Sequence, residues 1–366
     1  MKIPRFLRPL LPIARALRSL DNALWRPVPE RVARAHRVHH RTGRPFAHHS
    51  VEGLEPRIAA RFLQSNSYEQ EEHLLKFPGP LRLEPARGWG ITEDRRLFWE
   101  AIPFSRTDRP PRPSYVLDRL RPPPRKRVDS VVAGRYWMHN YFHFFNDFLG
   151  SLLLCESLGV PPEVPVVVPD SVLRLPFFQY AAAHFVPLAR RPILVQGAEH
   201  LWVSGTAWFP KVMPNRRALW DGVLDALELP SVDSTEEVDL FVHRRGAHVR
   251  GLANEAQILE RASREGFQIV DPGALGVADQ MRLFRRARRV VGVHGAGLSN
   301  VAFRRGAPLD LLEIFPETLI APHYFWLCRE YGYGYRALLG GPERGGRFSL
   351  DPDALARALE GLRRSR

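Results

Sequence analysis

Residues 289–300 read RVVGVHGAGLSN, and this stretch carries the clearest structural signal in the chain. The apolar run Val290–Val293 predicts a strand buried in a parallel sheet. The run breaks at His294-Gly295-Ala296-Gly297, after which residues 298–303 can begin a helix. A glycine turn between a strand and a helix presents backbone N–H groups to an anion, and the helix dipole favours phosphate there. The stretch therefore predicts an α/β fold with a phosphate-binding turn.

The residues around this turn leave more than one ligand open. A second apolar strand is expected over Leu309–Phe315, and its Glu313 carboxylate is suited to bind ribose hydroxyls. Gly292, Gly295 and Gly297 run in the reverse of the G-x-G-x-x-G order of dinucleotide-binding proteins. The pattern indicates a nucleoside diphosphate but fits either a dehydrogenase or a sugar-nucleotide enzyme. A tight turn with no ligand is the structural alternative.

Composition sets the limits of the problem. A chain of 366 residues with 45% hydrophobic residues is long enough for two globular domains. The formal charge of +14 points to an anionic partner such as a membrane surface or an acidic glycan. The arginines are scattered, however, and no nucleic-acid-binding module is recognisable, so nucleic acid is not expected. The two cysteines, Cys155 and Cys328, lie in apolar surroundings and are expected to be buried thiols in a reducing compartment.

The N-terminal third is the hardest part to interpret. Ile13, Leu17, Leu20 and Leu24 recur at helical spacing among arginines, so this end can lie on an anionic membrane or pack on the protein itself. No transmembrane helix or cleavable signal peptide is expected, because arginines interrupt the apolar runs. Residues 1–125 are otherwise expected to form an irregular Pro/Arg-rich arm, with short strands at 81–84 and 97–100.

Strands alternate with helices over the rest of the chain. Residues 126–235 predict a first α/β unit, residues 236–345 a second one, and residues 346–366 a C-terminal helix. This alternation favours right-handed βαβ units and parallel sheets. In the second unit the strand Val238–Val242 leads directly into His243-Arg244-Arg245.

A polar pair interrupts an otherwise apolar helix in the first unit. His143 and Asp147 are four residues apart in the helix expected over Tyr141–Leu158, so they share one helix face. Polar groups in apolar surroundings are costly unless they find partners or do chemistry. The pair is therefore a candidate for catalysis, and a buried pair that only ties the helix down is the alternative.

The order of several motifs resembles glycosyltransferase family 61, which includes capsular-polysaccharide enzymes and plant xylosyltransferases. The motifs are Arg244-Arg245, Asn254-Glu255, Gln280, residues 294–300, Phe303 and Leu312-Glu313-Ile314, together with the His-x-x-x-Asp pair. The resemblance covers roughly residues 136–316 and is strongest near Gly295. It implies the GT-B architecture, two doubly wound Rossmann-type domains facing a cleft, with the irregular arm added before them.

The resemblance also implies roles for individual residues. Asp147 is expected to be the general base, with His143 orienting the base or the acceptor and Asn140 beside them. Arg244 or Arg245 would bind the leaving diphosphate. The rest of the expected nucleotide site comprises His294, Gly295, Ala296, Gly297, Ser299, Asn300 and Glu313. No metal is expected, because the single Asp-x-Asp, Asp351-Pro352-Asp353, has the form of a helix cap.

The function expected from these features is an inverting, metal-independent glycosyltransferase with no added cofactor. It would use a UDP- or GDP-linked sugar and a glycan or lipid-linked acceptor in surface polysaccharide biosynthesis. The expected location is the cytoplasm, at the inner face of a bacterial inner membrane. A non-catalytic protein that binds polysaccharide or membrane is one alternative. An NAD-dependent oxidoreductase is another, weakened by the reversed glycine order.

Overall fold

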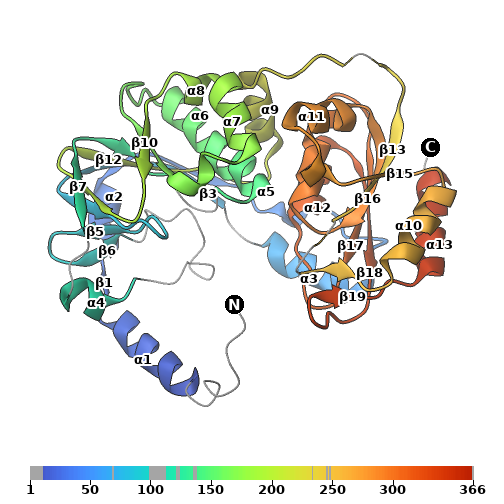
Figure 1. Ribbon diagram of the computed structural model, residues 1–366, viewed down its shortest axis with the longest axis horizontal. Coiled ribbons are helices and arrows are strands. Elements are labelled where there is room, and N and C mark those ends of the chain that lie inside the picture. Colours follow the sequence, from blue (N-terminus) through green and yellow to red (C-terminus); the bar gives the residue numbers. More distant parts are fainter. Residues whose placement is uncertain are drawn as a thin grey trace.

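The computed structural model describes residues 11–67, 70–98, 113–120, 124–134, 138–232, 234–244, 246 and 249–364 (Figure 1). These residues form a mixed α/β structure with three larger sheets and one two-stranded sheet. The predicted α/β class is therefore confirmed. Both cysteines are buried free thiols, as expected. In the described part of the chain, every helix is too short or too polar to cross a membrane.

The C-terminal sheet contains the strand and glycine turn of residues 289–300. Its strands are β13 (Val238–Val242), β15 (Gln268–Val270), β16 (Ala287–Val293), β17 (Asp310–Phe315) and β18 (Gly334–Leu339). All neighbouring strands are parallel, and the order is β15-β13-β16-β17-β18. The chain therefore changes its winding direction between β13 and β16. In doubly wound sheets ligands bind at the carboxyl ends of the two strands at this switch point.

Helices cover both faces of the C-terminal sheet (Figure 1). One face packs on α10 (Glu255–Arg264) and α13 (Pro352–Arg364), and the other on α11 (Val277–Arg285), α12 (His323–Tyr331) and the 3₁₀ helix η7 (Ala296–Arg304). Alternate strand residues divide accordingly, since Val290 belongs to one buried cluster and Val291 to the other. This burial on two sides explains the continuous apolar run in the sequence. The helix cap predicted before α13 is confirmed, because Asp351 accepts a hydrogen bond from the Asp353 amide at 3.0 Å.

The central sheet combines parallel and antiparallel strands. Four parallel strands, β10 (Ile193–Gln196), β9 (Val166–Pro169), β8 (Val131–Val132) and β12 (Thr206–Lys211), lie in that order. β3 (Gln70–Pro78) and β2 (Arg37–Gly43) extend the sheet antiparallel. The helices of this region are α7 (Pro176–His184), α8 (Val186–Ala189) and α9 (Arg217–Ala226), and β14 (Gly251–Leu252) pairs with β19 (Arg347–Phe348) elsewhere in the molecule.

The N-terminal sheet corrects the expectation of an irregular arm. Its order is β1 (Arg26–Pro27), β6 (Arg96–Phe98), β5 (Gly90–Thr92), β4 (Leu81–Leu83), β11 (His200–Val203) and β7 (Arg125–Val128). The expected strands near residues 81 and 97 are present as β4 and β6. The arm nevertheless shares sheets with later residues, since β3 pairs with β12 and β4 with β11. The arm also forms α1 (Leu11–Ala23), α2 (Glu30–Ala35), η2 (Phe46–His48), α3 (Pro56–Asn66) and α4 (Tyr115–Leu120). Strand pairs formed by residues so far apart in the sequence produce no local sequence pattern, so they could not be predicted from it.

A single helical run follows β8 of the central sheet and packs against the helices of the C-terminal sheet. It begins as α5 (Tyr141–His143), continues as the π-helix η4 (Phe144–Leu149) and ends as α6 (Gly150–Ser157). Phe145 in η4 packs edge to face against Phe303 in η7, with ring centroids 6.0 Å apart. A second aromatic contact joins α3 to the C-terminal half: the Phe62 ring stacks on the Phe325 ring of α12, with ring centroids 4.9 Å apart. One buried cluster therefore runs through both sheets and holds them together.

Candidate active site

The switch point of the C-terminal sheet brings Arg244 against the glycine turn. The Arg244 Nη1 donates a hydrogen bond to the His294 carbonyl oxygen at 3.3 Å. A Cβ atom on Gly295 would lie 3.1 Å from the Arg244 guanidinium carbon. The Gly295 φ of 172° is extended backbone that any residue adopts, so a side chain here would press on the Arg244 guanidinium but would not strain the backbone. The missing side chain lets a cation lie directly on the turn.

Arg250 is a second cation at this site, and the sequence analysis did not select it. Both guanidinium groups are partly buried, and burial followed by the charge of Arg250 lowers the pKa of Arg244. Burial also lowers the pKa of Arg250 itself. Among the residues that the structure describes, neither side chain forms an ion pair with a carboxylate. Two neighbouring, partly buried cations without a paired carboxylate are suited to bind a multiply charged anion. Arg245, the other predicted diphosphate ligand, lies outside the described residues.

Buried residues of the neighbouring strands β17 and β18 fix the His294 ring. Its Nδ1 lies 2.5 Å from Oε1 of Glu313, whose Oε2 accepts a hydrogen bond from the Tyr335 hydroxyl at 2.7 Å. Burial, together with Arg250 and Arg244, lowers the pKa of His294 to about 3, so the ring is neutral near pH 7. Burial also raises the pKa of the Glu313 carboxyl well above its ordinary value.

The predicted ribose contact of Glu313 needs correction. Its side chain is fully buried, and both of its oxygens face His294 and Tyr335 rather than an open site. A strand residue that points into the interior cannot reach a ligand beyond the strand end. Glu313 instead orients the His294 ring beside the glycine turn.

Ser299 and Asn300 also serve the fold. The Ser299 hydroxyl donates to the Ala296 carbonyl oxygen at 2.5 Å, within its own helical turn. Asn300 Nδ2 donates to Gln280 Oε1 and to the Gly297 carbonyl oxygen, each at 3.1 Å. Because both side chains are buried and their groups are taken, they shape the turn instead of binding a ligand directly. Ala296 and Gly297 lie in the first turn of η7, where backbone N–H groups lack partners within the helix.

The predicted pair in the first unit forms a close contact. The Nδ1 of His143 lies 2.5 Å from Oδ2 of Asp147, and Asn146 Nδ2 donates to the other oxygen at 3.1 Å. Both side chains keep about a fifth of their surface exposed, at 20% and 18%. Asn140, expected to contact substrate, caps α5 by accepting from the Phe142 and His143 amides at 3.0 and 3.3 Å. The π-helix that follows is a rare form often found at functional sites.

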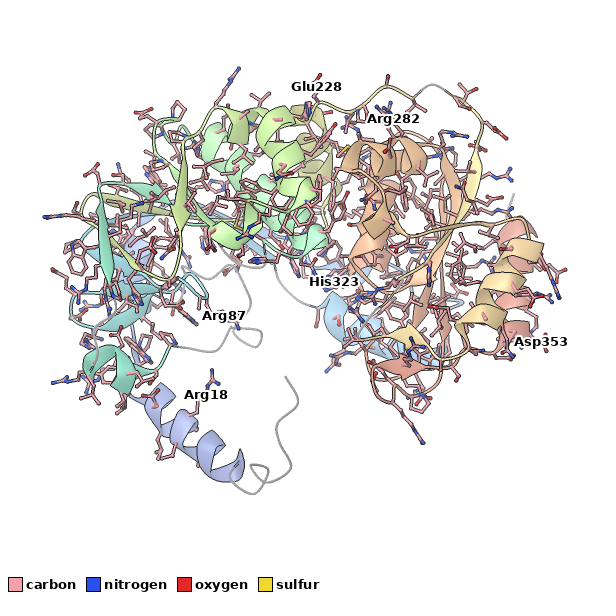
Figure 2. The ribbon with its side chains drawn as sticks, in the orientation of Figure 1. Arg18, Arg87, Glu228, Arg282, His323 and Asp353 are labelled. Carbon is pink, nitrogen blue, oxygen red and sulfur yellow. The ribbon has the colours of Figure 1, made fainter. Side chains whose placement is uncertain are left out.

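His323 is the first residue of α12 (Figure 2), and it is an electrostatic neighbour both of this pair and of His294. Its ring is 6.4 Å from the His294 ring and 5.5 Å from the Phe142 ring. Burial, then His294 and His143, lower its pKa to about 3, while Asp147 acts in the opposite direction. The structure therefore brings His143, Asp147, His323, His294 and Arg244 into one neighbourhood. A lone histidine before an aromatic helix carries no motif, so its sequence gave no reason to select it.

A direct link fixes the two sides of this neighbourhood. The Tyr141 hydroxyl donates to Asn300 Oδ1 at 2.8 Å, which joins the start of the His143–Asp147 helix to the helix after the glycine turn. The Tyr324 hydroxyl donates to the Gly295 carbonyl oxygen at 2.7 Å. These bonds hold the glycine turn from two directions.

Comparison with known proteins supports the resemblance seen in the motifs. Residues 141–308 match the family described as Glycosyltransferase 61. The matched region includes the His143–Asp147 pair, Arg244, Arg250 and the glycine turn, and ends before Glu313 and His323. No curated protein matches the chain.

The two buried histidines predict how stability depends on pH. Because the pKa of His294 and of His323 is about 3 in the folded protein against an ordinary value of 6.5, only the unfolded chain gains these protons as pH falls between these two values. The free energy of unfolding should therefore fall from near pH 6.5 down towards pH 3. His323→Gln should reduce that slope by up to about 1.4 kcal/mol per pH unit in urea unfolding at several pH values.

Tyr324→Phe is the matched control for this measurement. It removes the hydrogen bond to the Gly295 carbonyl but no group that titrates in acid, so it should lower stability by about 1 kcal/mol at every pH. A slope that His323→Gln leaves unchanged would show that His323 is charged in the folded protein.

Proposed function

We propose that this protein, whose residues 141–308 form a glycosyltransferase 61 region, is an inverting transferase that uses a nucleotide sugar. The match of residues 141–308 to glycosyltransferase 61 supports glycosyltransferase activity, and we add the donor and the mechanism to that proposal. The observation that carries it is the pair of partly buried arginines, Arg244 and Arg250, beside the glycine turn. Such a site suits the diphosphate of a UDP- or GDP-linked sugar, whose negative charge would relieve the repulsion between the arginines.

The donor half of the reaction is assigned to the C-terminal sheet. The carboxyl ends of β13 and β16 meet where the sheet changes direction, the usual ligand position in doubly wound folds. As the bond from the anomeric carbon to the phosphate oxygen breaks, its electron pair leaves with the nucleoside diphosphate. Arg244 and Arg250 stabilise the growing charge, and the first amides of η7 add to the field. In this scheme arginines supply the positive charge, so no metal is required.

The acceptor half is assigned to the His143–Asp147 pair. The acceptor hydroxyl oxygen attacks the anomeric carbon from the side opposite the phosphate, and its proton passes to the pair. The contact of 2.5 Å between the imidazole Nδ1 and the carboxylate Oδ2 lets the two groups act as one unit. Asp147 remains the proposed general base, with His143 as its partner. The neutral His323 positions this unit relative to the donor site.

We also propose a GT-B arrangement of the two α/β halves and a glycan acceptor. The parallel strands of the central sheet follow the order expected of a Rossmann-type half, and with the C-terminal sheet they are consistent with a GT-B arrangement. The acceptor is proposed to be a glycan or lipid-linked glycan in surface polysaccharide synthesis, at the cytoplasmic face of the membrane.

Nucleotide binding tests the donor site. Thermal-shift titration should show that UDP or GDP raises the melting temperature, while NAD does not. Arg244→Ala and Arg250→Ala should each weaken the binding of that nucleotide roughly 10- to 150-fold, since each loses a charge-assisted hydrogen bond of about 1.5–3 kcal/mol. Arg264→Ala, an exposed arginine of α10 paired with Glu260, is the matched control. Stabilisation by NAD alone would favour the oxidoreductase alternative, and no stabilisation by any nucleotide the non-catalytic one.

Transfer kinetics test the proposed base. Asp147→Asn keeps the size of the side chain but cannot take a proton, so kcat should fall by about 10²–10⁴-fold. Binding of the nucleotide should stay within a few-fold of the unchanged protein, because Asp147 is not part of the arginine site. The kcat of His143→Gln should fall by a factor in the same range. Equal turnover by Asp147→Asn would exclude the pair as the base.

Chelation tests the role assigned to the arginines. Transfer measured after dialysis against EDTA should keep its rate, and added Mg²⁺ or Mn²⁺ should change it less than twofold. A strict requirement for either ion would assign the leaving-group charge to a metal instead.

A further inference from the structure

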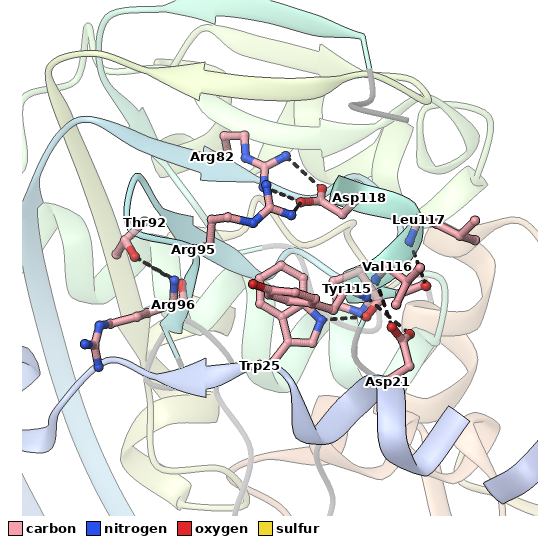
Figure 3. A network of polar contacts seen from close by, with 12 residues as sticks. Asp21, Trp25, Arg82, Thr92, Arg95, Arg96, Tyr115, Val116, Leu117 and Asp118 are labelled. Carbon is pink, nitrogen blue, oxygen red and sulfur yellow. Dashed lines mark hydrogen bonds and ion pairs between the residues drawn. The ribbon is translucent and has the colours of Figure 1, made fainter. Parts of the chain in front are cut away.

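Helix α4 has its polar side inward and its apolar side outward. Tyr115 and Asp118 face the N-terminal sheet, where Asp118 is buried and accepts from both terminal nitrogens of Arg82 at 2.8 Å (Figure 3). Arg95 adds a third bond to Asp118 at 2.7 Å. The opposite side carries Val116, Leu117 and Leu120, which are 42%, 66% and 77% exposed. A helix on the surface of a globular protein normally has the reverse arrangement.

Helix α1 continues this apolar surface. The Asp21 carboxylate accepts from the Tyr115 and Val116 amides at 3.2 and 2.8 Å and so fixes α1 to the start of α4. Trp25, just after α1, donates to the Pro113 carbonyl oxygen and packs edge to face on Tyr115. From this attachment α1 extends away from the three sheets (Figure 1), and its residues 16–20 are all exposed. Leu17 and Leu20 of α1 are 62% and 67% exposed, and Leu24, just after the end of the helix, is 49% exposed.

The charged side chains on the outer side of α1 and α4 are positive. Arg18 and Arg119 are exposed, next to Leu17 and Leu120 respectively. Within the described residues of α1 and α4, the two carboxylates are Asp21 and Asp118, and both are used in the attachments above. The outer side therefore combines leucine side chains with arginines and no available carboxylate. Lys2, Arg5 and Arg8 in the preceding sequence have the same sign.

We propose that α1 and α4 together form a docking surface for an anionic lipid bilayer. The five exposed apolar side chains on the two attached helices, with Leu24 just after α1, would enter the interface between headgroups and acyl chains, while Arg18 and Arg119 pair with lipid phosphates. The buried Arg82–Asp118–Arg95 network keeps α4 oriented while its outer side leaves water. The charge pattern favours a lipid surface over a second copy of this chain, whose matching surface would carry the same positive charge. This inference does not depend on the proposed chemistry.

Co-sedimentation of the full chain with vesicles tests the proposal. The protein should bind vesicles of phosphatidylcholine mixed with phosphatidylglycerol and bind phosphatidylcholine alone at least tenfold more weakly. Leu17→Gln with Leu20→Gln, and separately Leu117→Gln with Leu120→Gln, should each lower the partition coefficient by on the order of tenfold or more. Arg18→Gln with Arg119→Gln should lower it roughly fivefold per arginine on anionic vesicles only.

Matched measurements separate the proposal from its alternatives. Leu63→Gln changes a leucine of α3 that is 55% exposed, and it should bind vesicles like the unchanged protein. All the altered side chains are exposed, so the melting temperature should stay constant across the set. The proposal is overturned if the leucine variants bind as well as the unchanged chain. It is also overturned if light scattering shows a dimer that the leucine variants dissociate while vesicle binding is absent.

Discussion

The packing of the helical run from Tyr141 to Ser157 against η7 and α12 is the constraint on which the candidate site depends. Phe145 contacts Phe303, and the Tyr141 hydroxyl holds Asn300, so the helix that carries His143 and Asp147 is fixed to the helix after the glycine turn. His323 fills the space between them, close to both His294 and Phe142. Because the contact is aromatic and buried, a shift of either side would open a cavity. The relative position of the proposed base and the proposed diphosphate site is thus set by the core.

Electrostatics at the site follow from the same burial. The two histidines nearest the glycine turn are neutral, whereas Arg244 and Arg250 keep their charge and repel one another in partly buried positions. The fold therefore carries an unfavourable cationic site that a diphosphate would stabilise. The Glu313 carboxyl does not neutralise it, because that group is turned inward to His294 and Tyr335. The same burial of Arg244 and Arg250 that costs stability in the free protein would therefore favour the binding of a diphosphate.

The N-terminal third has a larger structural role than its composition suggests. Its strands complete the central sheet and build most of the N-terminal sheet, and α3 packs on the C-terminal half through Phe62. The leucines of α1 and of the outer side of α4 are exposed, and the polar residues of α4 attach it to the N-terminal sheet. The same segment thus contributes both to the core and to an exposed apolar surface.

Sequence alone determined those features that depend on near neighbours. Apolar runs located β13, β16 and β17, the i,i+4 spacing placed His143 beside Asp147, and motif order indicated the family that residues 141–308 match. Tertiary structure decided what depends on distant residues. It paired β3 with β12, brought Arg250 and His323 to the site, and turned Glu313, Ser299 and Asn300 into supports. The physical reason is that a local pattern specifies which side of an element is apolar. Which partner covers that side, and where a polar side chain finds its hydrogen bonds, is settled only when the elements pack.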